Sequence, residues 1–428
     1  MRPDRAGHQL QSRVIIATAM AVTVLSWGAS ASAQIDLVSS DTVHGVLDLR
    51  AAEADGEPSF TNGGFGKARF GGDGGSGFTG RVQLATAALE WTPRLNWEWS
   101  AVIDVLAQPG QEHSVDIGQA YIVYKPVPRS ATRFNVRAGL FYPAISMEND
   151  ARAWGVTNTI TPSAINSWVG EEVKVAGVEA SATRAFGDQE FTATAAVFGF
   201  DDTAGTLLSF RGWALHDIQS QANGRFRLPP LSPFISQVQP DETYSTLDID
   251  HHVGYYGRVE WRSAGPLTLN AFYYDNLGNM IGVTPDLEWA WATRFLDVGA
   301  RWDVDAQTKV MAQALTGKTV MGFPTPGGRF ANMDFRSAYL LATHLVGKSA
   351  FTARADLFDT HDNSAAFLGD TNERGWAITG AWRYPLTKLV DVRLEALHVD
   401  STRPSRAYAN EAAHQAQTVL QSSLRLSF

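Results

Sequence analysis

The segment TVLQSSLRLSF, residues 418–428, alternates apolar and polar side chains up to the last residue of the chain. Its apolar parity consists of Leu420, Leu424, Leu426 and Phe428. Its polar parity consists of Gln421, Ser423, Arg425 and Ser427. Successive side chains of a β-strand point to opposite faces, so the segment predicts a strand with one apolar face. Terminal residues are poorly ordered unless an element of structure holds them, and we therefore expect this strand to be paired in a sheet.

The same period-2 alternation recurs along the chain, with almost no helical periodicity. In FTARADLF, residues 351–358, Phe351 and Leu357 share one parity, while Arg354 and Asp356 share the other. Such runs predict sixteen strands near 43–51, 79–91, 97–108, 115–126, 132–142, 172–184, 189–200, 252–263, 267–276, 291–303, 308–320, 335–346, 350–359, 376–385, 389–400 and 418–428.

The predicted connections alternate strictly between short and long. The short ones are 92–96, 127–131, 185–188, 264–266, 304–307, 347–349 and 386–388. The long ones are 52–78, 109–114, 143–171, 201–251, 277–290, 321–334, 360–375 and 401–417. An even number of antiparallel strands, with short periplasmic turns and long outer loops, is typical of a transmembrane β-barrel. We therefore predict an all-β fold, a 16-stranded antiparallel barrel whose last strand pairs with its first.

Parity also decides one ambiguous segment, LLSFRGWALH at residues 207–216. A seventeenth strand there would place the tight turn at 264–266 on the side of the long loops. We therefore assign this segment to the long fourth loop, as a short helix.

The N-terminal region has the pattern of a secretory signal peptide. Three arginines precede the apolar run VIIATAMAVTVL (residues 14–25), and small residues at an A-x-A site follow it. The run is too short for a transmembrane helix. Residues 1–33 are therefore expected to be removed, which leaves one barrel domain at 34–428. Removal of three arginines and one aspartate changes the formal charge from −9 to near −11, which argues against a nucleic-acid partner. The chain has no cysteine, which excludes disulfides and thiolate metal sites.

Alternation alone also fits a secreted soluble β-sandwich, in which the apolar face would form the core. Two further observations favour the membrane. The predicted strands are about as long as a tilted strand needs to cross hydrocarbon. Aromatic residues on the apolar parity lie beside the short turns, as in an interfacial girdle: Trp97, Trp261, Trp302, Tyr384 and Phe428.

Two segments resemble known families. The terminal Phe428 after alternating apolar residues resembles the C-terminal signature that the barrel-assembly machinery recognises in bacterial outer-membrane proteins. The segment VRAGLFYPAISMEND, residues 136–150, resembles phosphate-selective porins of the O/P type through Gly139, Phe141, Pro143, Ser146 and Glu148. DIGQAYIVYKP, residues 116–126, resembles the strand that precedes this segment in those porins. The resemblance implies a 16-stranded channel, a homotrimer, and a third outer loop (here 143–171) that folds into the pore.

Charged residues on the polar parity are expected to line a wet lumen. The basic ones are Arg133, Arg137, Arg258, Arg262, Arg354 and Arg393. The acidic ones are Glu98, Asp104, Glu260, Asp356, Asp391 and Glu395. Opposed ladders of this kind could orient anions or zwitterions. The alternative is that they pair with one another and only solvate the wall.

The expected constriction loop contributes Glu148, Asp150, Arg152, Trp154, Trp168, Glu171 and Glu172. This acidic set lacks the basic constriction that a phosphate path requires, so phosphate specificity is not expected. DIDHH, residues 248–252, is not expected to bind metal, because adjacent residues of a strand face opposite sides. Residues 63–77 are not a phosphate-binding loop, because Ala68 follows Lys67. His344 is expected on a lumen face as a wall histidine, without the partners of a catalytic triad.

The sequence thus predicts a bacterial outer-membrane porin for passive diffusion of small polar or charged solutes, anions among them. No enzymatic activity, cofactor or metal is expected. The expected partners are outer-membrane lipid, the barrel-assembly machinery and two further copies of the chain. Two alternatives remain: a surface protein or barrel enzyme that acts through residues 201–251, and a secreted soluble β protein.

Overall fold

A computed structural model describes residues 35–75, 77–111, 113–365 and 369–428. The expected signal peptide lies outside these residues. No helix within the described ranges combines the length and the apolar character needed to cross a membrane.

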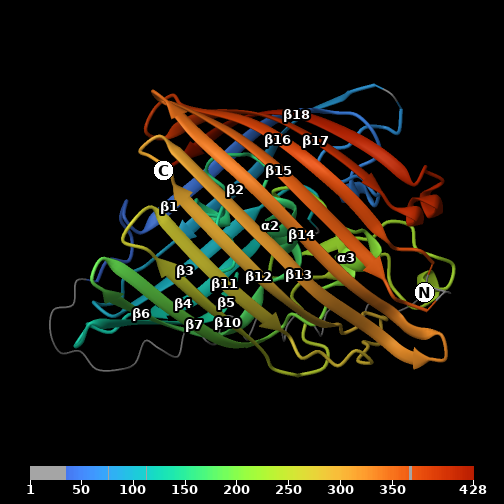
Figure 1. The fold of residues 1–428 in the computed structure, drawn as a ribbon, viewed down its shortest axis with the longest axis horizontal. Helices are drawn as coiled ribbons and strands as arrows, with labels where there is room; N and C mark the ends of the chain where they lie inside the picture. Colours follow the sequence, from blue (N-terminus) through green and yellow to red (C-terminus); the bar gives the residue numbers. More distant parts are fainter. Residues whose placement is uncertain (1–34, 76, 112, 366–368) are drawn as a thin grey trace.

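The described chain forms a closed antiparallel barrel of sixteen strands, which confirms the predicted fold. Figure 1 shows the long strands tilted around the enclosed loops. The barrel strands are β1 (Val43–Ala54), β2 (Thr79–Trp91), β3 (Trp99–Ala107), β4 (Asp116–Tyr124), β5 (Thr132–Phe141), β6 (Val175–Phe186), β7 (Gln189–Gly199), β10 (Gly254–Arg262), β11 (Leu267–Asp275), β12 (Ala292–Asp303), β13 (Thr308–Thr325), β14 (Gly328–Val346), β15 (Ser349–Asp362), β16 (Glu373–Pro385), β17 (Val390–Thr402) and β18 (His414–Ser427).

The ring closes between β1 and β18, from Val46 opposite Ser427 to Ala54 opposite Val419. Phe428 continues this pairing, because its N–H donates to the carbonyl oxygen of Gly45 and its own carbonyl accepts from the Gly45 N–H. A Cβ on residue 45 would lie 2.3 Å from the Phe428 ring. Glycine at 45 therefore leaves the space that the terminal ring occupies beside the barrel wall.

Side-chain burial follows the predicted parity. The polar side chains face the interior of the barrel, and the apolar side chains face outward. On β15, Phe351 and Leu357 are 49% and 64% exposed on the outer surface, whereas Arg354 and Asp356 are 1% exposed on the inside. A soluble sandwich has the opposite arrangement, with the apolar face buried. An apolar exterior around a polar interior is the pattern of a membrane barrel.

One predicted loop is wrong. Residues 321–334 were expected to form a long outer loop, but β13 and β14 extend into a hairpin whose last paired residues are Thr325 and Gly328. The prolines and glycines at 322–328 are usual signals for a loop. The hairpin accommodates them through a register shift between Met321 and Pro324, and Met321 is buried among apolar residues of the other loops.

Three outer loops fold into the barrel. The first loop (residues 55–78) contains η1 (Phe60–Asn62) and the third loop (142–174) contains η2 (Arg152–Trp154) and α2 (Ala164–Glu172). The fourth loop (200–253) contains α3 (Thr206–Phe210), η3 (Ile235–Gln237) and a separate two-stranded sheet of β8 (Arg225–Arg227) and β9 (Glu242–Tyr244). The last loop carries η5 (Pro404–Ala409). Figure 1 shows α2 and α3 enclosed by the strands. The short helix expected within 207–216 corresponds to α3.

Candidate functional site

Shortly before the third loop begins, β5 contains a glycine that the geometry requires. Gly139 has φ +139°, and a Cβ there would lie 2.3 Å from the carbonyl oxygen of Ala120 on the neighbouring strand. Just beyond the strand, the Tyr142 hydroxyl lies 3.1 Å from the carbonyl oxygens of Gly170 and Ser220. Its ring stacks on Trp154 with centroids 4.4 Å apart. The beginning of the third loop is thereby fastened to its own helix and to the fourth loop.

The N-terminus of α2 is held by one carboxylate of the barrel wall and one of the third loop itself. Asp356 accepts the Ala164 N–H at 3.0 Å, and Glu148 accepts the Ser163 N–H at 2.7 Å. Carboxylates at this end satisfy free N–H groups and complement the helix dipole. Arg354 donates to Asp356 at 2.8 Å and to the carbonyl of Thr161 at 2.6 Å. Arg354 therefore clamps the helix start against the wall.

A second anchor lies on β17 and β18. Arg393 donates to the carbonyl oxygens of Val156 (2.9 Å) and Thr159 (3.0 Å), and Glu395 accepts the Thr161 N–H at 3.1 Å. Arg425 donates to Val156 at 3.2 Å and to Asp48 at 2.9 Å. The third loop is thus bound along its length by wall side chains that face the lumen.

These contacts correct part of the predicted pore lining. Arg354, Asp356, Arg393 and Glu395 face inward as expected, but each is buried against the third loop. Asp104 is also buried, at 1% exposure, and neither carboxylate oxygen has a hydrogen-bond partner among the described residues. The five side chains do not line open space. Sequence parity gives the face of a strand, but it does not say which loop covers that face.

The constriction residues divide in the same way. Asp150 and Arg152 are exposed, with Asp150 accepting from the Thr157 hydroxyl and Arg152 pairing with Glu90 at 2.9 Å. Trp168, by contrast, is 1% exposed and packs edge-on against Phe295 and Phe335. Trp168 was expected to narrow the pore, but it is part of the apolar core between α2 and the wall.

Two glutamates at the C-terminus of α2 bind residues of the fourth loop. Glu171 pairs with Arg211 at 2.5 and 2.7 Å and with His216 at 2.9 Å. Burial alone would raise the pKa of Glu171, but Arg211 and His216 outweigh it and hold that pKa at about 2. Glu172 accepts the Leu207 N–H at 2.8 Å at the start of α3, and burial raises the pKa of Glu172 to about 7.

The first loop binds both the barrel wall and the fourth loop. Lys67 pairs with Glu373 on β16, donates to the Arg211 carbonyl at 3.1 Å, and accepts the Leu215 N–H on its own carbonyl at 2.7 Å. Burial lowers the pKa of Lys67 to about 8, although Glu373 opposes this shift. Glu57 pairs with Arg406 at 2.6 Å. First, third and fourth loops therefore form one plug, defined here as residues 55–75, 142–174 and 200–221.

The position of the fourth loop differs from the prediction. Residues 201–251 were expected as an outer insertion, yet every residue from 201 to 216 is buried. The signal in the sequence is the apolar content of this stretch, with Leu207, Leu208, Phe210, Trp213 and Leu215. Such a run is unusual for a solvated loop, and its place inside the barrel depends on contacts with the first and third loops.

Open space remains along the opposite wall. A cavity of about 790 Å³, which we call the vestibule, is lined by the inner faces of β3 to β7 and β10 near the short turns. It brings together six predicted lumen residues: Glu98, Arg133, Arg137, Arg258, Glu260 and Arg262. Arg133 and Arg262 are each 58% exposed at their side chains.

Arginine and glutamate alternate around the vestibule. Arg133 pairs with Glu190, and Arg137 pairs with Glu179 at 2.8 Å. Glu260 pairs with both Arg258 and Arg262. A separate cavity of about 40 Å³ lies beside Arg152, Trp154 and Arg425 at the third loop. The charged vestibule is therefore much larger than the cavity at the third loop.

The other predicted residues lie elsewhere. Trp97, Trp302 and Phe428 are each at least half exposed, while Trp261 and Tyr384 are partly buried beside aromatic neighbours. His344 was expected on a lumen face, but it is exposed on the outer parity of β14 and lines a groove there. DIDHH is a loop rather than a strand. Asp248 and Asp250 have carboxylate oxygens within 4.8 Å of Asp202, which could supply oxygen ligands to a cation.

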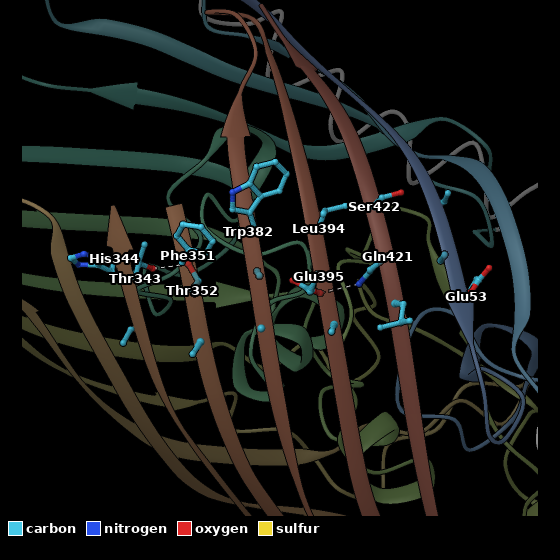
Figure 2. A pocket seen from close by; sticks show the side chains of 18 of the residues that line it. Glu53, Thr343, His344, Phe351, Thr352, Trp382, Leu394, Glu395, Gln421 and Ser422 are labelled. Atoms are coloured by element: carbon cyan, nitrogen blue, oxygen red, sulfur yellow. Dashed lines mark hydrogen bonds between the residues drawn. The ribbon is translucent and has the colours of Figure 1, made fainter. Parts of the chain in front are cut away.

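The outer groove has a volume of about 1090 Å³ and is shown in Figure 2. Its floor is a row of small residues paired in register across four strands: Ala342, Ala353, Gly380 and Ala396. Phe351, Trp382 and Leu394 form the adjacent row and stand beside it as a ridge. The outer wall is thus hollowed across β14 to β17.

Comparison with known proteins supports the fold. The barrel is similar to the outer membrane channel DcaP of Acinetobacter baumannii, with a TM-score of 0.56 at 12% identity over 94% of this chain and 99% of that chain. It is also similar to a loop L8 deletion mutant of OmpT, an outer membrane protein of Vibrio cholerae, with a TM-score of 0.50 at 10% identity over 90% and 99% of the two chains. No family model matches the sequence, and no curated protein matches it. The likeness shows the barrel fold, and the resemblance of residues 136–150 to phosphate-selective porins stays a prediction.

Proposed function

We propose that this chain is an outer-membrane channel through which small polar or charged solutes diffuse. The observation that carries the proposal is a charged, water-accessible vestibule inside a closed barrel whose outer face is apolar. Lipid would cover the apolar exterior, and the polar interior would stay wet. Transport of this kind needs no catalytic step and no cofactor.

The route we propose runs along β3 to β7 and β10, because the opposite wall is covered by the plug. Six basic side chains line the vestibule: Arg94, Lys125, Arg133, Arg137, Arg258 and Arg262. Four acidic side chains face them: Glu98, Glu179, Glu190 and Glu260. The basic excess favours small anions over cations, since wall charge sets the selectivity of a wide pore.

Conductance of purified protein in a planar bilayer tests the proposal. A channel gives stable steps, and a salt gradient then gives a reversal potential of the sign expected for anion preference. Inserted, folded protein without conductance would contradict the channel. Conductance with cation preference would leave the channel in place and contradict the assigned wall charge.

We also propose the homotrimer that the sequence resemblance implies, with the outer groove at a contact between copies. Small residues let membrane-embedded surfaces approach closely. A Cβ on residue 380 would meet no described atom within 4 Å, so the groove has room for a partner's side chains. Filling it with Ala353→Phe and Gly380→Phe should shift the purified protein from oligomer to monomer in native gels. An unchanged oligomer would place the contact elsewhere.

Phe428 is proposed as the assembly signal for the barrel-assembly machinery. It pairs with Gly45 at the closing seam, so its deletion should reduce the folded barrel in the outer membrane while export continues. A surface role for residues 201–251 gains no support, because the first part of that insertion is buried in the interior.

A further inference from the structure

The outer surface of β12, β13 and β14 carries three basic side chains side by side. Arg294 and Lys318 are directly opposite each other across β12 and β13. Arg336 on β14 is one step diagonal to Lys318, because Lys318 is opposite Asp334 and Thr316 is opposite Arg336. All three share the outward parity of Leu296 and Leu340, which are about half exposed.

Their height in the barrel can be estimated from the aromatic girdle. Trp302, half exposed on the same face of β12, lies eight residues from Arg294. With a rise of about 3.4 Å per residue and a tilt of about 40°, eight residues span roughly 20 Å of membrane, close to the ~25 Å apolar band of such barrels. Ala300, Val298 and Leu296 fill the interval. Arg294 therefore lies at the headgroup level of the outer leaflet.

The pairing of Arg294 with Lys318 is unfavourable in the isolated protein. Like charges directly opposite on neighbouring strands destabilise a sheet. Lys318 is 3.4 Å from Asp334, and Arg336 is 2.6 Å from Asp359. Among the described residues, no carboxylate lies within the 4 Å ion-pair distance of Arg294. Asp275, its partner on β11, is engaged by the Leu277 N–H at 2.9 Å and the Tyr273 hydroxyl at 3.3 Å.

We propose that Arg294, Lys318 and Arg336 bind the phosphate group of an anionic lipid in the outer leaflet. The inference rests on the membrane placement proposed above. Arginine and lysine donate charge-assisted hydrogen bonds to phosphate oxygens, and a phosphate between Arg294 and Lys318 relieves their repulsion. The Arg336 side chain is 73% exposed and can reach the same group. The neighbouring apolar residues would pack against the acyl chains.

The test measures lipid retention in nanodiscs of zwitterionic phospholipid. Purified barrel is loaded with lipid A that carries both phosphates or with dephosphorylated lipid A, and bound lipid is counted by native mass spectrometry. The parent protein should retain the phosphorylated form about tenfold better or more. Arg294→Gln with Lys318→Gln should abolish this preference. The matched control is Lys348→Gln with Lys388→Gln on exposed short turns, and it should retain the preference.

A second measurement separates lipid binding from a structural role. Arg294→Gln should raise the thermal midpoint of the barrel in zwitterionic detergent, because it removes the repulsion with Lys318. The same substitution should remove the stabilisation that phosphorylated lipid A gives to the parent. A lower midpoint in lipid-free detergent would show that Arg294 has a structural partner and would overturn the proposal.

Three further outcomes count against the lipid site. Equal retention of both lipids would overturn it, and so would an unchanged preference in the double variant. Displacement of the lipid by millimolar inorganic phosphate would identify a free-phosphate site instead. A chain that fails to insert into nanodiscs would refute the membrane placement, whereas an inserted barrel without lipid preference would refute only this site.

Discussion

Both halves of the barrel wall carry arginine–carboxylate pairs, but the pairs have different roles on the two halves. On β15 to β18, Arg354 and Arg393 are buried and bind backbone carbonyls of the third loop. On β5 and β10, the side chains of Arg133 and Arg262 are more than half exposed, and both pair with Glu190 on β7. The difference is whether a loop covers the wall. Covered pairs hold the plug in place, and uncovered pairs set the charge of the vestibule.

Burial also decides how much each ion pair contributes to the stability of the fold. Breaking a buried ion pair by removing one partner costs about 3–5 kcal/mol, because the remaining charge is left in a dry environment. An exposed pair contributes about 0–1 kcal/mol. The comparison therefore predicts large structural effects on the covered side, and electrical effects without structural ones on the open side.

The largest effect is expected from Arg211→Glu. The substitution places a carboxylate against buried Glu171 and should expel α3 from the interior. The chain has no cysteine, so Ser209→Cys, buried in α3, gives a clean probe. Labelling by a membrane-impermeant maleimide should be slow in the parent background and fast with Arg211→Glu, and conductance should rise severalfold.

The matched control for this prediction is Arg227→Glu, an exposed position in the same loop. It should leave labelling of Ser209→Cys slow. Protection that persists with Arg211→Glu would mean that the plug is held by its apolar core rather than by the ion pair.

Arg354→Gln on the covered wall and Arg133→Gln on the open wall allow a direct comparison of unfolding free energies. Loss of Arg354 leaves Asp356 and Glu148 without their cation, and we expect a loss of about 3–5 kcal/mol in unfolding free energy. Loss of Arg133 should change it by less than about 1 kcal/mol. Urea unfolding in lipid vesicles measures both, and equal values would remove the distinction between covered and open wall.

A smaller, pH-dependent effect is expected at Glu172. Burial raises its pKa from 4.5 to about 7, so the packed interior binds this proton more tightly than a released loop does. The stabilisation is complete below pH about 4.5, declines as pH rises, and is lost above pH about 7. Labelling of Ser209→Cys, normalised to an exposed Lys388→Cys, should be faster at pH 8 than at pH 5. Glu172→Gln should remove the dependence, and a reversed trend would mean that another group controls release.

The smallest structural change with a measurable outcome is charge reversal in the vestibule. Arg133→Glu with Arg262→Glu, two side chains that are each 58% exposed, should shift the reversal potential toward cation preference while the barrel stays folded. The measurement is a bilayer recording in a salt gradient, with Lys348→Glu on an exposed turn as control. A potential that does not move would show that solutes do not pass beside these arginines.

The sequence predicted most of the wall because strand alternation is local. Each of the sixteen segments shows its own period of two, and the terminal strand 418–428 required a partner near residues 43–51, which the β1–β18 pairing supplies. The hairpin at 321–334 was missed because prolines and glycines usually mark loops. Its pairing is maintained by a register shift and by contacts of Met321 with other loops.

The same alternation predicted that Arg354, Asp356, Arg393 and Glu395 face inward. It did not predict that the third loop covers them, because the covering residues, such as Thr161 and Val156, are about 200 positions away in the sequence. The entry of residues 201–216 into the lumen depends equally on Lys67, Glu171 and Glu172 from two other loops.

By itself, the sequence determined the closed ring and most of the strands and their faces, because side-chain period and turn spacing are properties of neighbouring residues. Only the tertiary structure decided which inward charges are dry and which remain wet. That outcome depends on where the outer loops fold, because burying a charge is stable only when distant segments supply its partners.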